Sequence, residues 1–202
     1  MALATWWQGD PDMKITPVPN FQARLADHPE QLARINHLGI GEVSERRRAG
    51  HRPYVGYVGA TAVTYGWVAT RTAAIGELSL VFTIPAGDRY LWDFATLPEW
   101  QGRGLYPCLL HAIVRIEDAD RFWIIHAPEN MSSDVGIQTA GFQDVGQLSF
   151  RPDGSVGLIP AAQHARARFG AALLGVPLLE GGLSPCPRCV DRIACACKLD
   201  PE

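Results

Sequence analysis

The sequence predicts an α/β fold built on a mixed sheet, and three observations lead to this class. Four segments rich in β-branched and aromatic residues follow one another across turns, as in an antiparallel meander; they are residues 54–58, 62–69, 77–84 and 90–96. Residues 105–118 have the apolar spacing of a helix, and residues 121–127 form one more apolar strand. The strand, helix and strand over 90–127 make a βαβ unit, whose two strands should be parallel.

Helices are expected on both sides of this region. Residues 28–38 place Leu32, Ile35 and Leu38 on one helical face. A second short helix is expected at 42–49, where the charged run from Glu45 to Arg48 is typical of a solvated face. The remaining expected elements are an extended N-terminal arm at 1–20 with a short strand at 14–18, a helix at 132–139, a hairpin of 147–150 and 156–159, and a helix at 161–174.

Composition narrows the class of protein. The chain has 202 residues, of which 47% are hydrophobic and 19% charged, which suits a globular protein with a sizeable core. A net charge of −3 argues against broad nucleic-acid binding, which needs many phosphate contacts. The first residues show no basic region followed by an apolar run, and no stretch is long enough to span a bilayer. We therefore expect a cytoplasmic protein without a membrane or nucleic-acid partner, as a monomer or homodimer.

A glycine loop joins the strand at 90–96 to the helix that follows it. The loop is Gln101-Gly102-Arg103-Gly104, and it opens directly onto Leu105 and the helical segment. The first turn of a helix has unpaired N–H groups and a partial positive charge. Glycines allow a phosphate to approach these amides closely, and Arg103 adds a full charge. The segment predicts an anion site that holds a phosphorylated ligand.

Two motifs resemble those of the GNAT superfamily, the acetyl-CoA-dependent N-acetyltransferases. The central GNAT motif is Arg or Gln, two residues, Gly, one residue, then Gly or Ala, and here it is Gln101 to Tyr106, with tyrosine at the last position. The second motif is Asn130, then Ser133, then the pair Gly141-Phe142. The resemblance covers residues 28–150. It implies a GNAT-like mixed, mostly antiparallel central sheet flanked by helices, with strands that splay apart at the cofactor cleft.

The resemblance also implies how the cofactor binds. The pyrophosphate of CoA would lie on the N–H groups of residues 102–106, and the pantetheine arm would run along the strand before the loop like an added strand. An amine, on a small molecule or a protein, would attack the acetyl thioester directly, and a backbone N–H in the cleft would stabilise the oxyanion. The implied cofactor-binding residues are Phe94, Ala95, Thr96, Leu97, Gln101, Gly102, Arg103, Gly104, Leu105, Tyr106, Asn130 and Ser133.

Attack by an amine needs a base, because an ammonium cannot attack. The candidates are Asp93, Glu77 and His126, each with a structural alternative: a hydrogen-bond acceptor in the strand, a solvated strand end and a core histidine, respectively. The family's usual general acid is a tyrosine seven residues after the asparagine, which is Ile137 here. Tyr106 or another tyrosine would replace it, the thiolate would leave without help, or the domain would bind acyl-CoA without turnover.

Cysteines cluster at the C-terminal end. Cys186 and Cys189 form a C-x₂-C pair and Cys195 and Cys197 a C-x-C pair, so four thiols lie within twelve residues. Four such ligands can close on one zinc ion, and the same ligands serve an iron–sulfur cluster; disulfides and free thiols remain alternatives. Cys108 stands apart, and core packing is its expected role.

We therefore expect a GNAT-like acyl-CoA-binding domain at 1–160 and a C-terminal helix with a Cys-rich metal-binding tail at 161–202. The predicted function is an N-acetyltransferase that moves an acetyl group from acetyl-CoA to an amine in a ternary complex. The alternative is a non-catalytic acyl-CoA-binding or regulatory module with a metal-bearing interaction tail.

Overall fold

The computed structural model describes residues 1–11 and 15–181. The strands are β1 (Ala2–Trp7), β2 (Phe21–Leu25), β3 (His51–Val58), β4 (Thr61–Ala69), β5 (Thr72–Ile75), β6 (Leu80–Thr83), β7 (Asp88–Thr96), β8 (Arg121–His126), β9 (Gln143–Phe150) and β10 (Val156–Pro160). The helices are α1 (Pro29–Asn36), α2 (Ile40–Arg48), α3 (Leu105–Ile116), α4 (Met131–Thr139) and α5 (His164–Leu174), with 3₁₀ turns η1 (Gly76–Leu78) and η2 (Pro98–Trp100).

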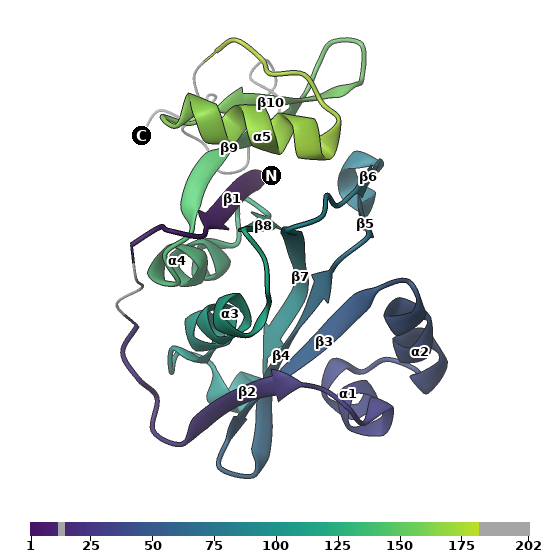
Figure 1. Ribbon diagram of the computed structural model, residues 1–202, viewed down its shortest axis with the longest axis vertical. Coiled ribbons are helices and arrows are strands. Elements are labelled where there is room, and N and C mark those ends of the chain that lie inside the picture. The colour runs from purple at the N-terminus through teal and green to yellow at the C-terminus, as the bar shows by residue number, and fades with distance from the viewer. Residues whose placement is uncertain (12–14, 182–202) are drawn as a thin grey trace, which may run out of the picture.

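An eight-stranded sheet forms the centre of the molecule, in the order β10-β9-β1-β8-β7-β4-β3-β2 (Figure 1). Strands β7 and β8 are parallel, and the other neighbouring pairs of this sheet are antiparallel. Helix α3 connects the parallel pair, so the expected βαβ unit is confirmed. The predicted mixed, mostly antiparallel sheet flanked by helices is confirmed with it.

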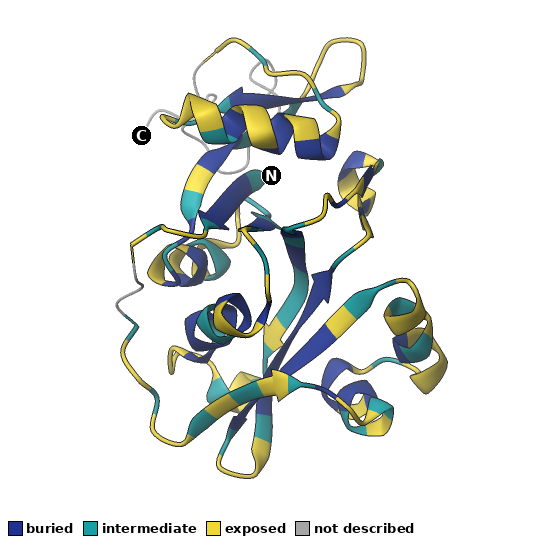
Figure 2. Ribbon diagram, viewed as in Figure 1, coloured by how far each residue is buried: buried dark blue, intermediate teal, exposed yellow. Residues whose placement is uncertain are grey.

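Helices cover both faces of the sheet (Figure 1). On one face, α3 and α4 pack with Phe122 and Ile124 of β8, and we call this the α3/α4 face. On the opposite face, α1 and α2 cover Trp67 of β4, while α5 covers Leu3 and Trp123 at the other end of the sheet. Figure 2 shows the buried residues gathered on the strands and on the sheet-facing sides of the helices. No helix in the described ranges is long and apolar enough to cross a membrane.

The N-terminal segment was predicted wrongly as an extended arm. Residues 2–7 form β1, which lies between β8 and β9, and residues 15–18 form no strand. Leu3 and Ala4 are both buried, on opposite faces, so β1 lacks the polar alternation that marks a half-buried strand. Its partners are also far away in the sequence; the Thr5 hydroxyl, for example, donates to the Phe122 carbonyl. The edge strand β2 was missed as well.

The segment 77–84 was only partly predicted. Its second half is β6, but Glu77 lies in the 3₁₀ turn η1, and β6 pairs with β5 in a separate two-stranded sheet. The β5–β6 connection is therefore a tight turn, with Ser79 in the left-handed conformation at φ 51°. This geometry places Glu77 beside the main sheet instead of within it.

Strands β7 and β8 separate after a short parallel stretch. Their paired residues run from Asp88 with Arg121 to Leu91 with Ile124, and β7 then continues to Thr96 without this partner. β7 instead stays paired with β4 across a bulge, where Trp67 faces Trp92 and Tyr65 faces Ala95. A bulge bends its strand and increases the local twist. The bend turns β7 away from β8, and the predicted splay is confirmed.

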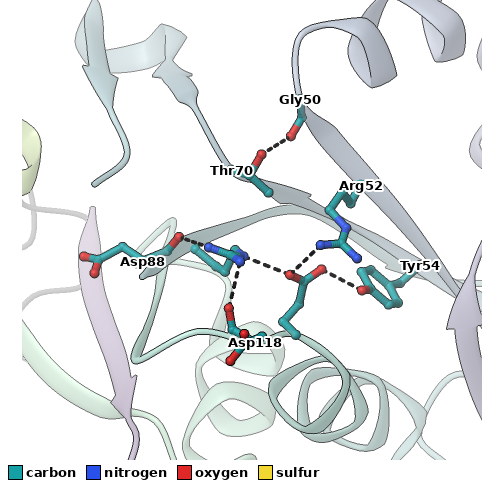
Figure 3. A network of polar contacts seen from close by, with 8 residues as sticks. Gly50, Arg52, Tyr54, Thr70, Asp88 and Asp118 are labelled. Atoms are coloured by element: carbon teal, nitrogen blue, oxygen red, sulfur yellow. Dashed lines mark hydrogen bonds and ion pairs between the residues drawn. The ribbon is translucent and has the colours of Figure 1, made fainter. Parts of the chain in front are cut away.

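A buried carboxylate fixes the end of α3 (Figure 3). Glu117 is fully buried and accepts hydrogen bonds from the Tyr54 hydroxyl at 2.6 Å, Arg89 Nε at 2.8 Å and Arg52 Nη1 at 3.1 Å. Burial and the nearby Glu117 raise the pKa of Tyr54, so its hydroxyl stays a donor. These bonds tie the C-terminal end of α3 to β3 and β7.

Candidate active site

A cleft of about 1040 Å³ opens where β7 and β8 separate. Its walls are the C-terminal half of β7, the glycine loop, the first turn of α3, the end of β8 and the first two turns of α4. The structure brings most of the predicted site residues to this one cleft; they are Glu77, Asp93, Phe94, Ala95, Thr96, Gln101, Gly102, Gly104, Leu105, Tyr106, His126, Asn130 and Ser133. Leu97 and Arg103 do not line it.

The predicted anion site is open at the mouth of the cleft. Gly102 and Gly104 have φ near +72°, which glycine adopts without strain, and Gly104 is the N-cap of α3. A Cβ atom at either glycine would meet nothing within 4 Å. Among the described residues, none accepts a hydrogen bond from the backbone N–H groups of 102–106. The loop thus presents free amides at the positive end of a twelve-residue helix.

The two polar side chains of the loop turn away from these amides. Gln101 Nε2 donates to the Thr96 carbonyl at 3.1 Å. Arg103 donates to the Glu99 carbonyl at 3.0 Å, and its guanidinium lies 4.7 Å from the centre of the Trp100 ring. In this conformation, the backbone amides of the loop line the cleft and the Arg103 side chain does not.

Asp93 lies at the bulge of β7 and has the left-handed φ of 51°. Gly66 lies opposite the bulge, and a Cβ there would come within 2.1 Å of the Phe94 ring, so the bulge requires glycine on the neighbouring strand. Arg46 Nη1 of α2 donates to Asp93 Oδ2 at 2.5 Å. The same guanidinium bonds Glu42 and stacks on Trp92, with 4.6 Å between its central carbon and the ring centre.

This contact corrects the interpretation of the charged run on α2. Glu45, Arg47 and Arg48 are exposed as expected, but the side chain of Arg46 is only 18% exposed. The helix therefore directs one cation of the run to the sheet, where its aliphatic stem packs and its charge meets Asp93. His51 lies beside it and accepts the Trp92 indole N–H at 3.2 Å on Nδ1; burial, together with Arg46, lowers the pKa of His51 and keeps it neutral.

Glu77 and His126 lie on different sides of the cleft. Glu77 is exposed in η1, near the buried Tyr90, whose pKa is raised by burial and by the Glu77 charge. His126 ends β8 on the α3/α4 face, with a side chain only 6% exposed. Its Nδ1 is 3.1 Å from the Ala127 carbonyl oxygen, and its Nε2 is 3.5 Å from Asp134 Oδ1 without a hydrogen bond.

The side chain of Tyr106 extends from α3 to α4 at the wall of the cleft. Its hydroxyl is 3.5 Å from Ser133 Oγ, and its ring lies against Phe94 with 5.6 Å between centres. Burial raises the pKa of Tyr106 to about 12, and the contact with Ser133 only partly offsets this. Ile137, at the position of the family's usual acid, is fully buried and points into the core. Of the two, only Tyr106 reaches the cleft.

Asn130 is the N-cap of α4. Its Oδ1 accepts the Ser133 N–H at 3.0 Å and the Ser132 hydroxyl at 2.9 Å. The Asn-to-Ser spacing that the sequence motif contains is therefore a helix cap, which fixes the first turn of α4 at the cleft. The site residues that sequence reasoning missed are Arg46, Asp134 and Gly136.

The predicted metal ligands lie outside the described residues; they are Cys186, Cys189, Cys195 and Cys197. Within residues 1–11 and 15–181, no group of three or more His, Cys, Asp or Glu side chains is placed to hold a metal ion. Cys108 is buried on α3, and burial raises the pKa of its thiol, which agrees with the expected packing role.

Comparison with solved structures places the fold among acetyltransferases of the GNAT type. A GCN5-related N-acetyltransferase from Kribbella flavida superposes with a TM-score of 0.50 at 12% identity, over 71% of this chain and 53% of that protein. AAC(6′)-Iy, solved with the bisubstrate analogue CoA-S-monomethyl-acetylneamine, gives a TM-score of 0.50 at 15% identity, over 65% of this chain and 96% of that one. The chain thus spans about half of the Kribbella protein. No family model and no curated protein matches the sequence.

Proposed function

We propose that this protein is an acetyl-CoA-dependent N-acetyltransferase that forms a ternary complex with an amine acceptor. The observation that carries the proposal is the open anion site: free amides at 102–106, at a helix N-terminus, next to a cleft between two separating parallel strands. A diphosphate matches the free amides, and an extended amide-rich arm matches the unpaired edge of β7. CoA combines both groups in one molecule.

The sheet separates the two substrates in this proposal. Phe94, Tyr106, Asn130 and Ser133 belong to the α3/α4 face or to α4 itself, and they form the cofactor side. Asp93 and Trp92 meet Arg46 of α2 on the opposite face, which forms the acceptor side. The acetyl group would lie between β7 and β8, where a β7 amide N–H polarises its carbonyl. The bisubstrate analogue bound to AAC(6′)-Iy likewise joins CoA to an amine-derived acceptor.

Asp93 is the base that the geometry favours. Its Oδ2 is fixed by Arg46, and Asp93 is one of the residues that line the cleft. The left-handed backbone at Asp93 is consistent with a functional constraint, since such conformations cluster at active sites. In the reaction, the amine nitrogen forms a bond to the acetyl carbon, its proton passes to Asp93 Oδ1, and the carbon–sulfur bond breaks. Glu77 is more exposed, and His126 lies on the cofactor side.

Tyr106 stabilises the leaving thiolate by a hydrogen bond in this proposal. A thiol has an ordinary pKa of about 8.5. Since burial raises the pKa of Tyr106 to about 12, full proton transfer from the phenol to the thiolate is uphill. A charge-assisted hydrogen bond needs no transfer and still stabilises the negative sulfur. Solvent then protonates the thiolate as CoA leaves.

The experiment is a pair of measurements on the full chain. Thermal unfolding with and without acetyl-CoA tests the anion site, because a ligand that binds the native state raises the melting temperature. Release of CoA thiol with a panel of small and protein amines tests transfer. Stabilisation together with thiol release supports the transferase. Stabilisation without release from any amine supports the non-catalytic acyl-CoA-binding module, and no stabilisation contradicts both.

For the tail, we propose from the sequence that Cys186, Cys189, Cys195 and Cys197 hold one zinc ion, with an iron–sulfur cluster as the second choice. Four thiolates would complete the coordination shell, so the metal would be structural. Metal analysis of the purified protein and of Cys189→Ser tests this, and full metal retention in the variant contradicts a four-thiolate site. We also propose a cytoplasmic location for the protein and a small-molecule or protein amine as its acceptor.

A further inference from the structure

His126 is the one buried histidine in the wall of the cofactor cleft that the proposed mechanism does not use. Its Nε2 is shielded from solvent and, among the described residues, has no hydrogen-bond partner. Buried polar atoms are nearly always hydrogen-bonded, so an exception calls for an explanation. The nearest polar atom given for Nε2 is Asp134 Oδ1 of α4, at 3.5 Å.

The surroundings of the ring distinguish its two protonation states. Nδ1 lies 3.1 Å from the Ala127 carbonyl, which can only accept, so the proton of the neutral ring belongs on Nδ1. Nε2 then carries a lone pair that faces a carboxylate, and the two acceptors repel each other. In the doubly protonated ring, Nε2 carries a proton that points toward Asp134, and the same contact becomes an ion pair.

Asp134 links the protonation state of His126 to the residues that line the cofactor side of the cleft. It is next to Ser133, which the Asn130 cap holds by its N–H and which contacts the Tyr106 hydroxyl by its Oγ. Asp134 Oδ1 also accepts from Gln138 Nε2 at 3.0 Å, which keeps the carboxylate on the same side of α4. A shorter His126–Asp134 contact would draw the first turn of α4 toward β8.

We propose that His126 is a positioning residue for cofactor binding: its protonated ring pairs with Asp134 and holds the first turn of α4 in the orientation that receives acetyl-CoA. The inference rests on the proposed function of the cleft. The affinity for acetyl-CoA is then higher for the protonated ring than for the neutral ring, so it should rise as the pH falls.

Other charged groups of the described residues also lie near the ring. Asp134 faces it from α4, and Asp144 of β9 interacts with both Asp134 and His126. Burial first, and then the Asp134 charge, raises the pKa of Asp144. On β1, Ala2 pairs with His126 and brings no charge; the adjoining Met1 amino group, whose pKa burial lowers, interacts with Glu129 of the β8–α4 loop.

The test is the dissociation constant of acetyl-CoA for the full chain between about pH 5.5 and pH 8, a range that spans the histidine titration. The variants are His126→Gln and Asp134→Asn, and the matched control is His164→Gln, an exposed histidine with a similar Nδ1 contact to a carbonyl. A phosphate monoester on the ligand titrates near pH 6, so each variant is compared with the parent protein at every pH. The parent and the control should bind about fivefold more tightly at the acidic end than either variant does.

Thermodynamic linkage between protonation of His126 and binding of acetyl-CoA gives a second measurement. If protonation favours the cofactor, the bound cofactor favours protonation, and the ring nitrogen signals of His126 in NMR spectra should show the protonated form at higher pH with acetyl-CoA than without it. Equal pH dependence in the parent and both variants overturns the inference and leaves the transferase proposal intact. No acetyl-CoA binding at any pH overturns both. If His126→Gln does not fold, the result for Asp134→Asn alone tests the inference. The Asp134 side chain is 37% exposed, so an isosteric amide at this position should be tolerated.

Discussion

Gly136 on α4 and the ring of Tyr106 on α3 occupy complementary space. A Cβ atom at Gly136 would lie 2.4 Å from Tyr106 Cδ1 and 2.8 Å from Cε1, which no side chain tolerates without a shift. The glycine allows the two helices to close around the tyrosine, so the phenol reaches Ser133 at the cleft wall. Tyr106 takes the last position of the glycine motif, where a small residue is usual, and the space it needs is supplied by α4.

Replacing Gly136 by alanine tests this relationship. In the parent protein the added methyl group should destabilise the fold by about 1–3 kcal/mol, the usual cost of overpacking. In a Tyr106→Leu background the clash disappears, and the same change should stabilise by about 0.5–1 kcal/mol, because alanine favours a helix over glycine. Urea unfolding of the parent, the two single variants and the double variant gives the coupling free energy between Gly136 and Tyr106. An equal effect of Gly136→Ala in both backgrounds would show that the ring does not depend on this glycine.

Replacing Gly104 by phenylalanine should abolish binding of acetyl-CoA, because a side chain at the anion site excludes the diphosphate. Backbone strain alone would also destabilise the variant, since Gly104 has φ of 73°. Gly154→Phe is the control, because Gly154 has φ of 80° and open space, in the turn between β9 and β10. Both variants should lose similar stability, while only Gly104→Phe loses the thermal shift with acetyl-CoA. A retained shift would contradict the anion site.

Arg46→Met should reduce kcat by about tenfold to a hundredfold, since a misplaced base costs rate even when the substrates still bind. The KM for acetyl-CoA should not change, because Arg46 lies on the acceptor side of the sheet. Arg47→Met, on the same helix but exposed, should behave like the parent protein. Steady-state kinetics with a reactive amine separates the two constants. A change in KM for acetyl-CoA alone would place Arg46 in cofactor binding.

Glu117→Gln should destabilise the protein by about 3 kcal/mol or more, because it leaves the charges of Arg52 and Arg89 without their carboxylate. Arg52→Ala removes the more exposed partner and should cost about 1 kcal/mol at most. Chemical denaturation measures the loss of stability in both variants. If the two variants lost similar amounts of stability, the network would not depend on the Glu117 carboxylate more than on Arg52.

Asp10 provides a prediction for acid unfolding. Burial alone would raise its pKa, but hydrogen bonds from Arg166 and from the Trp7 N–H outweigh this and lower it. A lowered pKa means that the carboxylate stabilises the fold above its unfolded pKa of about 3.9, and that this contribution is lost as the pH falls through the lower folded value. Asp10→Asn should therefore be less stable than the parent at pH 7, with a gap that narrows below about pH 4. A gap that persists at pH 2 would contradict the assignment.

Local signals in the sequence predicted the parts of the site that are contiguous in the chain. The strand before the loop, the two glycines and the helix start lie within eighteen residues, from Asp88 to Leu105, and each has its own signature in spacing or backbone freedom. Asn130 and Ser133 were predicted for the same reason, although the contact between them is a helix cap. The splay followed from the family resemblance and is confirmed by the register of β7 and β8.

Contacts between segments that are distant in the chain could not be predicted from the sequence. Arg46 and Asp93 are 47 residues apart, and a cation inside a charged run shows no sign of which neighbour turns inward. Gly136 lies in a helix without an obvious reason for glycine until the Tyr106 ring is placed against it. β1 was missed because a strand buried on both faces has no alternation, and its neighbours are supplied by residues more than a hundred positions later.

The position of β1 has a consequence for how the chain acquires its shape. During synthesis, Ala2 to Trp7 emerge well before the strands on either side of them, because β8 and β9 lie more than a hundred residues later in the chain. The apolar residues of β1 therefore lack the strands with which they pair until more than a hundred further residues have been made. Closing a loop of this length is slow. Blocking these six residues on a nascent chain should leave the two halves of the sheet unable to join.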